Sequence, residues 1–78
     1  MEKNARKLLA QNLRVLRFKH GWTQEQVSHE SGLHRTYITH IEGAKSNVGI
    51  DQLDKLAHAF GIPIRELFDR PLIERARE

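Results

Sequence analysis

Apolar residues recur in the first part of the chain at the spacing of one helix face. This spacing predicts a first helix from about Asn4 to His20, with Gly21 as the residue that ends it. A second apolar stripe lies on another face of the same helix. It either marks an interface or packs beneath the C-terminal tail. The main stripe consists of Ala5, Leu9, Leu13 and Leu16, and the second of Leu8, Val15 and Phe18.

The second half of the chain continues the helical spacing. A helix is expected from about Ile50 to Phe60, with Gly49 as its N-cap and Asp51 near its positive end. Gly61 ends it, and a short fifth helix is expected from about Pro63 to Phe68. No strand signal competes with these patterns, so the fold class is all-α. The inward face of the longer helix consists of Leu53, Leu56, Ala57 and Phe60.

Between these segments, residues 23–43 predict two short helices joined by a tight turn. Thr23 and Gln26 have the spacing of a capping box, and Gly32 supplies a left-handed residue at the end of the first helix. The second helix is expected from His34 to Glu42, with many hydrogen-bond donors on its exposed face. Such a helix needs a polar surface to lie against, and the groove of a DNA duplex is the obvious candidate. The residues expected to face the core are Val27, Leu33, Ile38 and Ile41.

These residues carry a family resemblance that extends from about Leu9 to Phe68. The pattern resembles the helix-turn-helix of the Cro and phage-repressor type, and its most informative parts are TQE, GL and IxxIE. Within that superfamily, the run LHRTYITHIEG is similar to the controller proteins of restriction–modification systems. The resemblance implies a five-helix, lambda-repressor-like domain. It further implies a homodimeric transcriptional regulator that binds a pseudo-palindromic operator upstream of its own gene and an endonuclease gene.

Length and composition are compatible with this interpretation. Seventy-eight residues make one domain, with a core of about residues 5–68 and a tail, 69–78, that either adds a helical turn or is disordered. The chain has no cysteine, which fits a reducing cytoplasm, and neither a secretion signal nor a membrane span is expected. The net charge is +3 and the pI about 9.7. The excess of basic residues lies in the first twenty positions, and a basic domain of this kind is compatible with nucleic-acid binding.

Arg35 is the strongest candidate for base recognition. It begins the second helix of the motif, and its planar fork matches the O6 and N7 acceptors of guanine. The alternative is an ordinary solvated arginine. The neighbouring exposed side chains are expected to support base contact, although for each of them a surface-filling role is equally compatible with the pattern. These supporting residues are His34, Thr36, Thr39 and His40.

A second group of residues is expected to contact phosphates, which position a protein on DNA without specifying sequence. The resemblance places Gln24 at a phosphate while it braces the recognition helix. Tyr37 is expected to be partly core and partly phosphate contact. The loop after the recognition helix adds Lys45, Ser46 and Asn47.

The resemblance assigns three further roles. Arg17 and Glu42 are expected to form a buried or half-buried ion pair between the first and third helices. Glu25 occupies the position of an RNA polymerase contact in related repressors, although the helix dipole explains a glutamate there equally well. The C-terminal helices four and five are expected to form a twofold dimer. Its interface residues would be Ile64, Leu67 and Phe68.

No enzyme, metal site or cofactor is expected. The histidines do not have the i, i+4 spacing of metal ligands, and no nucleophile–base pair or glycine-rich phosphate loop is present. Within the DNA-binding class, a phage-type or chromosomal repressor and an autoregulating antitoxin remain alternatives. A protein-interaction adaptor on the same scaffold is the alternative that does not bind DNA.

Overall fold

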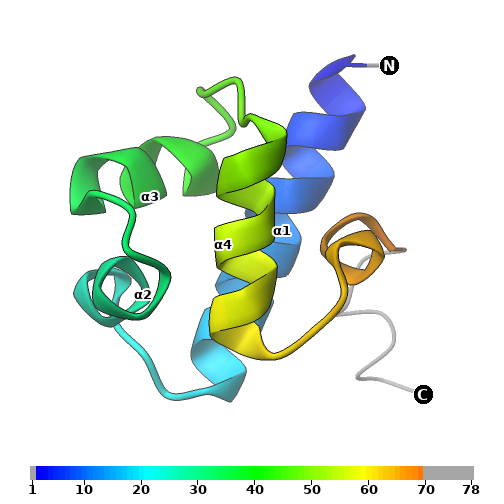
Figure 1. The fold of residues 1–78 in the computed structure, drawn as a ribbon. Coiled ribbons are helices and arrows are strands. Elements are labelled where there is room, and N and C mark those ends of the chain that lie inside the picture. Colours follow the sequence, from blue (N-terminus) through cyan, green and yellow to red (C-terminus); the bar gives the residue numbers. More distant parts are fainter. Residues whose placement is uncertain (1, 70–78) are drawn as a thin grey trace.

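The chain folds into four α-helices followed by one short 3-10 helix (Figure 1). The computed structural model describes residues 2–69, including the side chains of residues 5–69. The helices are α1 (Glu2–Lys19), α2 (Gln24–Ser31), α3 (Arg35–Glu42), α4 (Ile50–Phe60) and the 3-10 helix η1 (Ile64–Phe68). No strand occurs in this described part, so the all-α prediction is confirmed. The expectations for the rest of the tail lie outside the described residues.

The predicted fifth helix is wrong in type. Residues 64–68 form a five-residue 3-10 helix, preceded by Pro63 and followed by Asp69, both of extended conformation. The buried side-chain amide of Asn12 in α1 donates to the main-chain carbonyls of Leu67 (3.0 Å) and Asp69 (3.2 Å). Because a side chain from another helix binds these carbonyls, the segment satisfies them without a further helical turn. The domain therefore has four α-helices and one 3-10 helix.

The core lies where α1 and α4 meet the other elements. α1 packs against α3 and η1, while α4 packs against α2 and η1. In Figure 1, α2 and α3 lie on one side of the α1–α4 pair and η1 on the other. The main leucine stripe of α1 is buried as predicted, except that Ala5 is exposed beside an open hollow and Ala10, 2% exposed, is buried instead. The fully buried apolar side chains are Leu13, Val27, Ile38, Ile41, Leu56 and Leu67.

Trp22 closes one end of the core, a role that the sequence pattern did not reveal. Its ring stacks on Phe60 with a centroid distance of 5.3 Å and lies 4.6 Å from the ring of His20. Gly21 has a φ of 67°, which lets the Trp22 N–H reach the Arg17 carbonyl at 2.9 Å. This left-handed turn ends α1 and directs the tryptophan back onto α4.

The second apolar stripe of α1 is only partly covered. Leu8 and Val15 are half-buried, whereas Phe18 is 68% exposed. The guanidinium of Arg17 lies over the Phe18 ring, 4.7 Å from its centroid. None of the described helices is both long and apolar enough to cross a membrane.

Candidate nucleic-acid interface

Local backbone and side-chain features define both the start and the end of α2, the first helix of the motif. The Gln26 N–H donates to the Thr23 hydroxyl (3.1 Å), and the Thr23 N–H donates to the Gln26 side chain (2.7 Å). This confirms the predicted capping box of α2. Gly32 has a φ of 76° and ends α2, after which Leu33 turns into the core. The start and end of α2 therefore set the direction in which α3 leaves the turn.

His34 caps α3 with its own ring. Nδ1 accepts a hydrogen bond from the Thr36 N–H at 3.0 Å. Histidine is an uncommon N-cap, but here the ring replaces the oxygen of the usual serine or aspartate. One ring nitrogen of His34 is thus already engaged in the structure of the helix.

The outer face of α3 is polar and open. Arg35, Thr36, Thr39 and His40 are exposed, as is the capping residue His34. Ile38 and Ile41 on the opposite face are 0% and 2% exposed, and Tyr37 lies between the two faces. All five candidate base-contacting residues therefore share one accessible surface.

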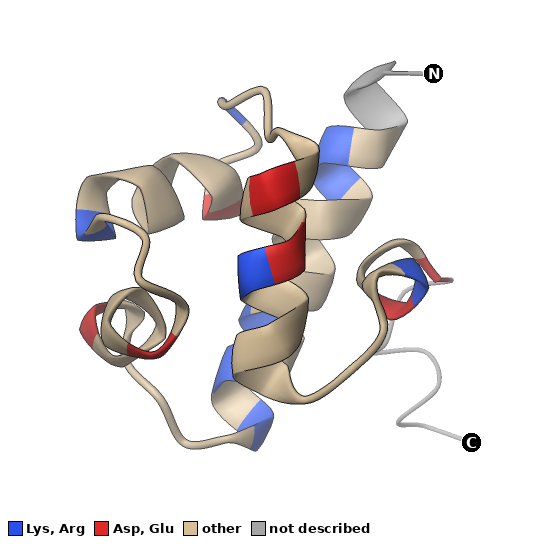
Figure 2. Ribbon diagram, in the orientation of Figure 1, with Lys and Arg blue, Asp and Glu red and all other residues tan. Residues whose placement is uncertain are grey.

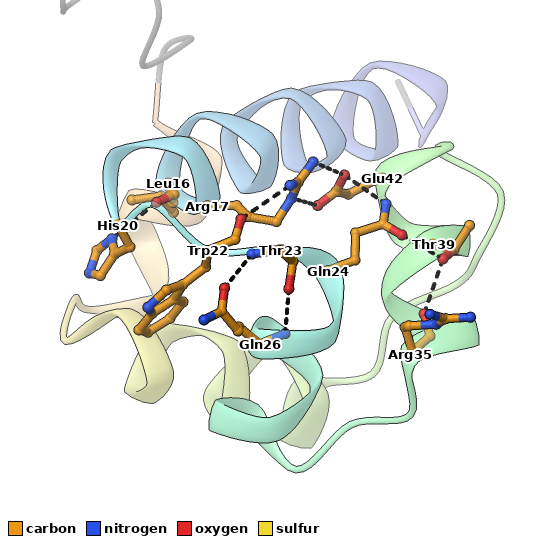
Figure 3. A network of polar contacts seen from close by, with 10 residues as sticks. All are labelled: Leu16, Arg17, His20, Trp22, Thr23, Gln24, Gln26, Arg35, Thr39 and Glu42. Carbon is orange, nitrogen blue, oxygen red and sulfur yellow. Dashed lines mark hydrogen bonds and ion pairs between the residues drawn. The ribbon is translucent and has the colours of Figure 1, made fainter.

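A polar network fixes α3 to α1 and α2 (Figure 3). Arg17 donates from Nε to Glu42 Oε2 (2.8 Å) and from Nη2 to Oε1 (3.1 Å), while Nη1 reaches the Trp22 carbonyl (3.2 Å). Gln24 Nε2 donates to Glu42 Oε1 at 3.1 Å. The Thr39 hydroxyl lies 2.9 Å from Gln24 Oε1 and 3.1 Å from the Arg35 carbonyl, and its single proton serves one of these acceptors at a time.

The ion pair in this network is largely removed from solvent. The Arg17 side chain is 15% exposed and that of Glu42 is 5% exposed. Gln24 forms the second link, since its amide bonds both Glu42 and Thr39. This shared amide couples the orientation of the recognition helix to the start of α2.

The loop after α3 is tied to the rest of the domain. The Tyr37 hydroxyl donates to the Asn47 carbonyl (3.3 Å), and Arg6 of α1 donates to the Asn47 side chain. Lys45 and Asn47 are exposed and Ser46 is half-buried. The candidate phosphate contacts in this loop thus lie on a segment anchored from both α1 and α3.

Two of the three predicted dimer residues lie at the surface, and the third does not. Leu67 is 0% exposed and belongs to the core of the protomer, so assigning it to a dimer interface is wrong. Its side chain points inward because Asn12 holds the adjoining main chain against α1. Ile64 and Phe68 are half-buried and pack beside the core.

Charge is distributed unevenly over the elements (Figure 2). Residues 5–19 of α1 contain only basic charged side chains, whereas α2 carries Glu25 and Glu30 and α4 carries Asp51 and Asp54. Glu25 is exposed in the first turn of α2. Among the described residues, no group of three or more histidine, aspartate or glutamate side chains could hold a metal ion.

Comparison with known proteins places the chain in a family. Residues 12–67 match the HTH_3 family model, described as helix-turn-helix. A hypothetical transcription factor of Neisseria meningitidis is 34% identical over 70 residues, which cover 90% of this chain but 66% of that protein. Control protein C.BamHI of Bacillus amyloliquefaciens is 39% identical over 70 residues, covering 88% of this chain and 86% of that protein.

A solved structure supports the same placement. The restriction–modification controller protein C.AhdI of Aeromonas hydrophila is 40% identical and superposes with a TM-score of 0.78, covering 81% of this chain and 96% of that one. These relatives are transcription regulators and controller proteins rather than enzymes. The chain belongs to the HTH_3 helix-turn-helix family of transcription regulators, and controller proteins of restriction–modification systems are among its close relatives.

Proposed function

We propose that this protein is a sequence-specific, homodimeric DNA-binding regulator that controls its own gene and a restriction endonuclease gene. The observation that carries the proposal is the open polar face of α3, held in one orientation by the Arg17–Glu42–Gln24 network. A rigid helix with exposed donors suits a DNA major groove. The similarity to controller proteins favours this role over those of a phage-type repressor or an autoregulating antitoxin.

Base recognition is assigned chiefly to Arg35. A gel-shift titration against the chain's own upstream DNA and a scrambled duplex tests this role. Arg35→Ala should lower affinity and abolish the preference for the upstream DNA. Arg35→Lys should keep the charge but lose the bidentate contact, with about 1–3 kcal/mol less discrimination. Lys55→Ala, which removes an exposed cation of α4, is the control and should leave both the affinity and the preference unchanged.

The same titration separates this function from an adaptor role. Wild-type protein that prefers its upstream DNA over the scrambled duplex at 150 mM salt supports the proposal. Binding that is equal for both duplexes and vanishes at moderate salt contradicts it, because only the electrostatic, sequence-independent component would then be present.

A contact with RNA polymerase is proposed for Glu25, which is exposed and adjacent to the candidate DNA surface. Glu25→Lys should keep DNA binding and lose activation of a reporter placed behind the upstream DNA. Glu30→Lys, in the last turn of the same helix, is the matched control. Normal activation by the Glu25 variant would remove this role.

A further inference from the structure

A polar stripe on α1 takes no part in the side-chain hydrogen bonds described above or in the function proposed so far. Lys7, Gln11 and Arg14 follow one another at i, i+4 and i+7 and therefore share one helix face. Lys7 and Arg14 are exposed, and Gln11 is half-buried. These three side chains line a shallow hollow together with the residues that follow α3.

Among the residues whose side chains the structure describes, no exposed acid lines the hollow beside this positive stripe. The carboxylate that borders it belongs to Glu42, which is 5% exposed and already paired with Arg17. The described acids of α2 and α4 lie on other elements (Figure 2). Lys7 and Arg14 are therefore free to attract an anionic surface outside the protein.

The stripe is also continuous with the candidate DNA surface. The same hollow is lined by Gly43 and Ala44, which directly follow the recognition helix and precede Lys45. Further along α1, Arg17 reaches Glu42 and lies beside Gln24 at the start of α2. In Figure 3, α1 runs along the edge of this network.

We propose that Lys7 and Arg14, with Gln11 between them, bind the sugar–phosphate backbone of DNA beside the groove that α3 enters. This inference rests on the proposed DNA-binding function and extends its contact surface from the motif to α1. The ligand chemistry is a pair of backbone phosphates, each neutralised by one side chain. Every such contact releases condensed counterions and steepens the salt dependence of binding.

The test is a salt series of gel shifts with the full chain and its own upstream DNA. Because each side chain occurs twice in the proposed dimer, Lys7→Ala and Arg14→Ala should each reduce the slope of log K against log salt by about 2, and the double variant by about 4. Lys55→Ala removes an exposed cation from α4 and should leave the slope unchanged. The preference for upstream over scrambled DNA should persist in all three stripe variants, since phosphate contacts carry no sequence information.

Phosphate-ethylation interference provides a second measurement. Wild-type binding should be blocked by ethylation at phosphates that no longer matter to the double variant, while interference elsewhere in the site persists. Wild-type slope and wild-type interference in the double variant would overturn the inference. A double variant that melts at a lower temperature yet binds DNA normally would also overturn it. The two cations would then stabilise the fold by interacting with the negative C-terminal end of the α3 dipole.

Self-association is the remaining outcome that would contradict the inference. If the stripe docks on the acidic face of a second copy, the double variant will sediment as a smaller species without DNA. The proposed function fails separately, when wild-type protein itself shows no preference for its upstream DNA. Failure of the stripe variants to change binding, with that preference intact, overturns only the α1 contact.

Discussion

At the residue scale, the buried carboxylate of Glu42 joins three helices. It accepts two hydrogen bonds from Arg17 of α1 and one from Gln24 of α2, while itself ending α3. A buried pair of this kind adds little net stability, because desolvation offsets the attraction. Its value lies in geometry, since each oxygen has a defined partner. Together with the burial of Ile38 and Ile41, this side chain holds the recognition helix at its angle to α1 and α2.

Glu42→Ala should destabilise the fold by about 3–5 kcal/mol, since it leaves the Arg17 guanidinium poorly solvated and without its anion. The fluorescence of Trp22, the single tryptophan of the chain, would report the shift in urea unfolding because its ring packs on Phe60. Glu30→Ala, an exposed glutamate of α2, is the control. A Glu42 variant with a midpoint close to wild type would contradict this structural role.

Ala44, which lies two residues after the end of α3, has a strained backbone conformation. It has a φ of 58°, and the following Lys45 N–H bonds the His40 carbonyl at 2.9 Å. An L-residue in this left-handed region costs about 1–2 kcal/mol, which glycine avoids. Glycine also has more conformational freedom in the unfolded chain, and this offsets about 0.4–1 kcal/mol of the stabilisation.

Ala44→Gly should therefore stabilise the protein by about 0.5–1 kcal/mol. A thermal melt compared with Ala59→Gly, a substitution inside α4 that should destabilise, would check the sign. A lower melting temperature for Ala44→Gly would show that the turn is not strained.

At the scale of the elements, the motif depends on helices too short to be stable alone. α2 and α3 have 8 residues each, below the length at which isolated helices persist in water. Their ends are closed by Thr23, His34 and Gly32, and their inner faces are buried. η1 is shorter still and depends on Asn12 of α1.

Asn12→Ala should loosen η1, because the Leu67 and Asp69 carbonyls lose their side-chain donor. The free energy of unfolding should fall by about 1–3 kcal/mol. Hydrogen exchange should rise in residues 64–68 more than in α2 or α3. Gln11→Ala, at the neighbouring half-buried position, is the comparison, and equal exchange in the two variants would argue against this anchoring role.

At the scale of the whole molecule, the elements separate charge from apolar surface. α1 presents cations, α2 presents Glu25 and Glu30, α4 presents Asp51 and Asp54 beside Lys55, and η1 presents Ile64 and Phe68 beside the core. A half-buried apolar pair at the end of a small domain suits contact with a second copy. The proposed dimer would place two recognition helices about 34 Å apart, one turn of DNA.

Ile64→Asp should convert the proposed dimer to a monomer and lower the affinity for the upstream DNA. Sedimentation velocity at micromolar concentration would measure the change. Ile50→Asp is a suitable control, because Ile50 is 75% exposed at the start of α4, the end of that helix opposite to the one that leads into η1. A dimeric Ile64 variant, or a dimer lost through Ile50, would place the interface elsewhere.

Local signals in the sequence predicted the helices well. The capping box of Thr23 and Gln26, the turn at Gly32 and the leucine spacing of α1 all act over a few residues, so they can be recognised in the chain. Asn12, Trp22 and the burial of Leu67 escaped prediction. Their roles depend on partners far along the chain, as with Asn12 and Leu67, which are separated by 55 positions.

By itself, therefore, the sequence determined the all-α class, the two helices of the motif and the set of polar residues on its outer face. The family resemblance added the pairing of Arg17 with Glu42. Only the tertiary structure decided that η1 is a 3-10 helix, that Leu67 belongs to the core, and that Gln24 links Glu42 to Thr39. Helix propensity and capping are properties of neighbouring residues, whereas burial and shared hydrogen bonds exist only once distant segments have packed.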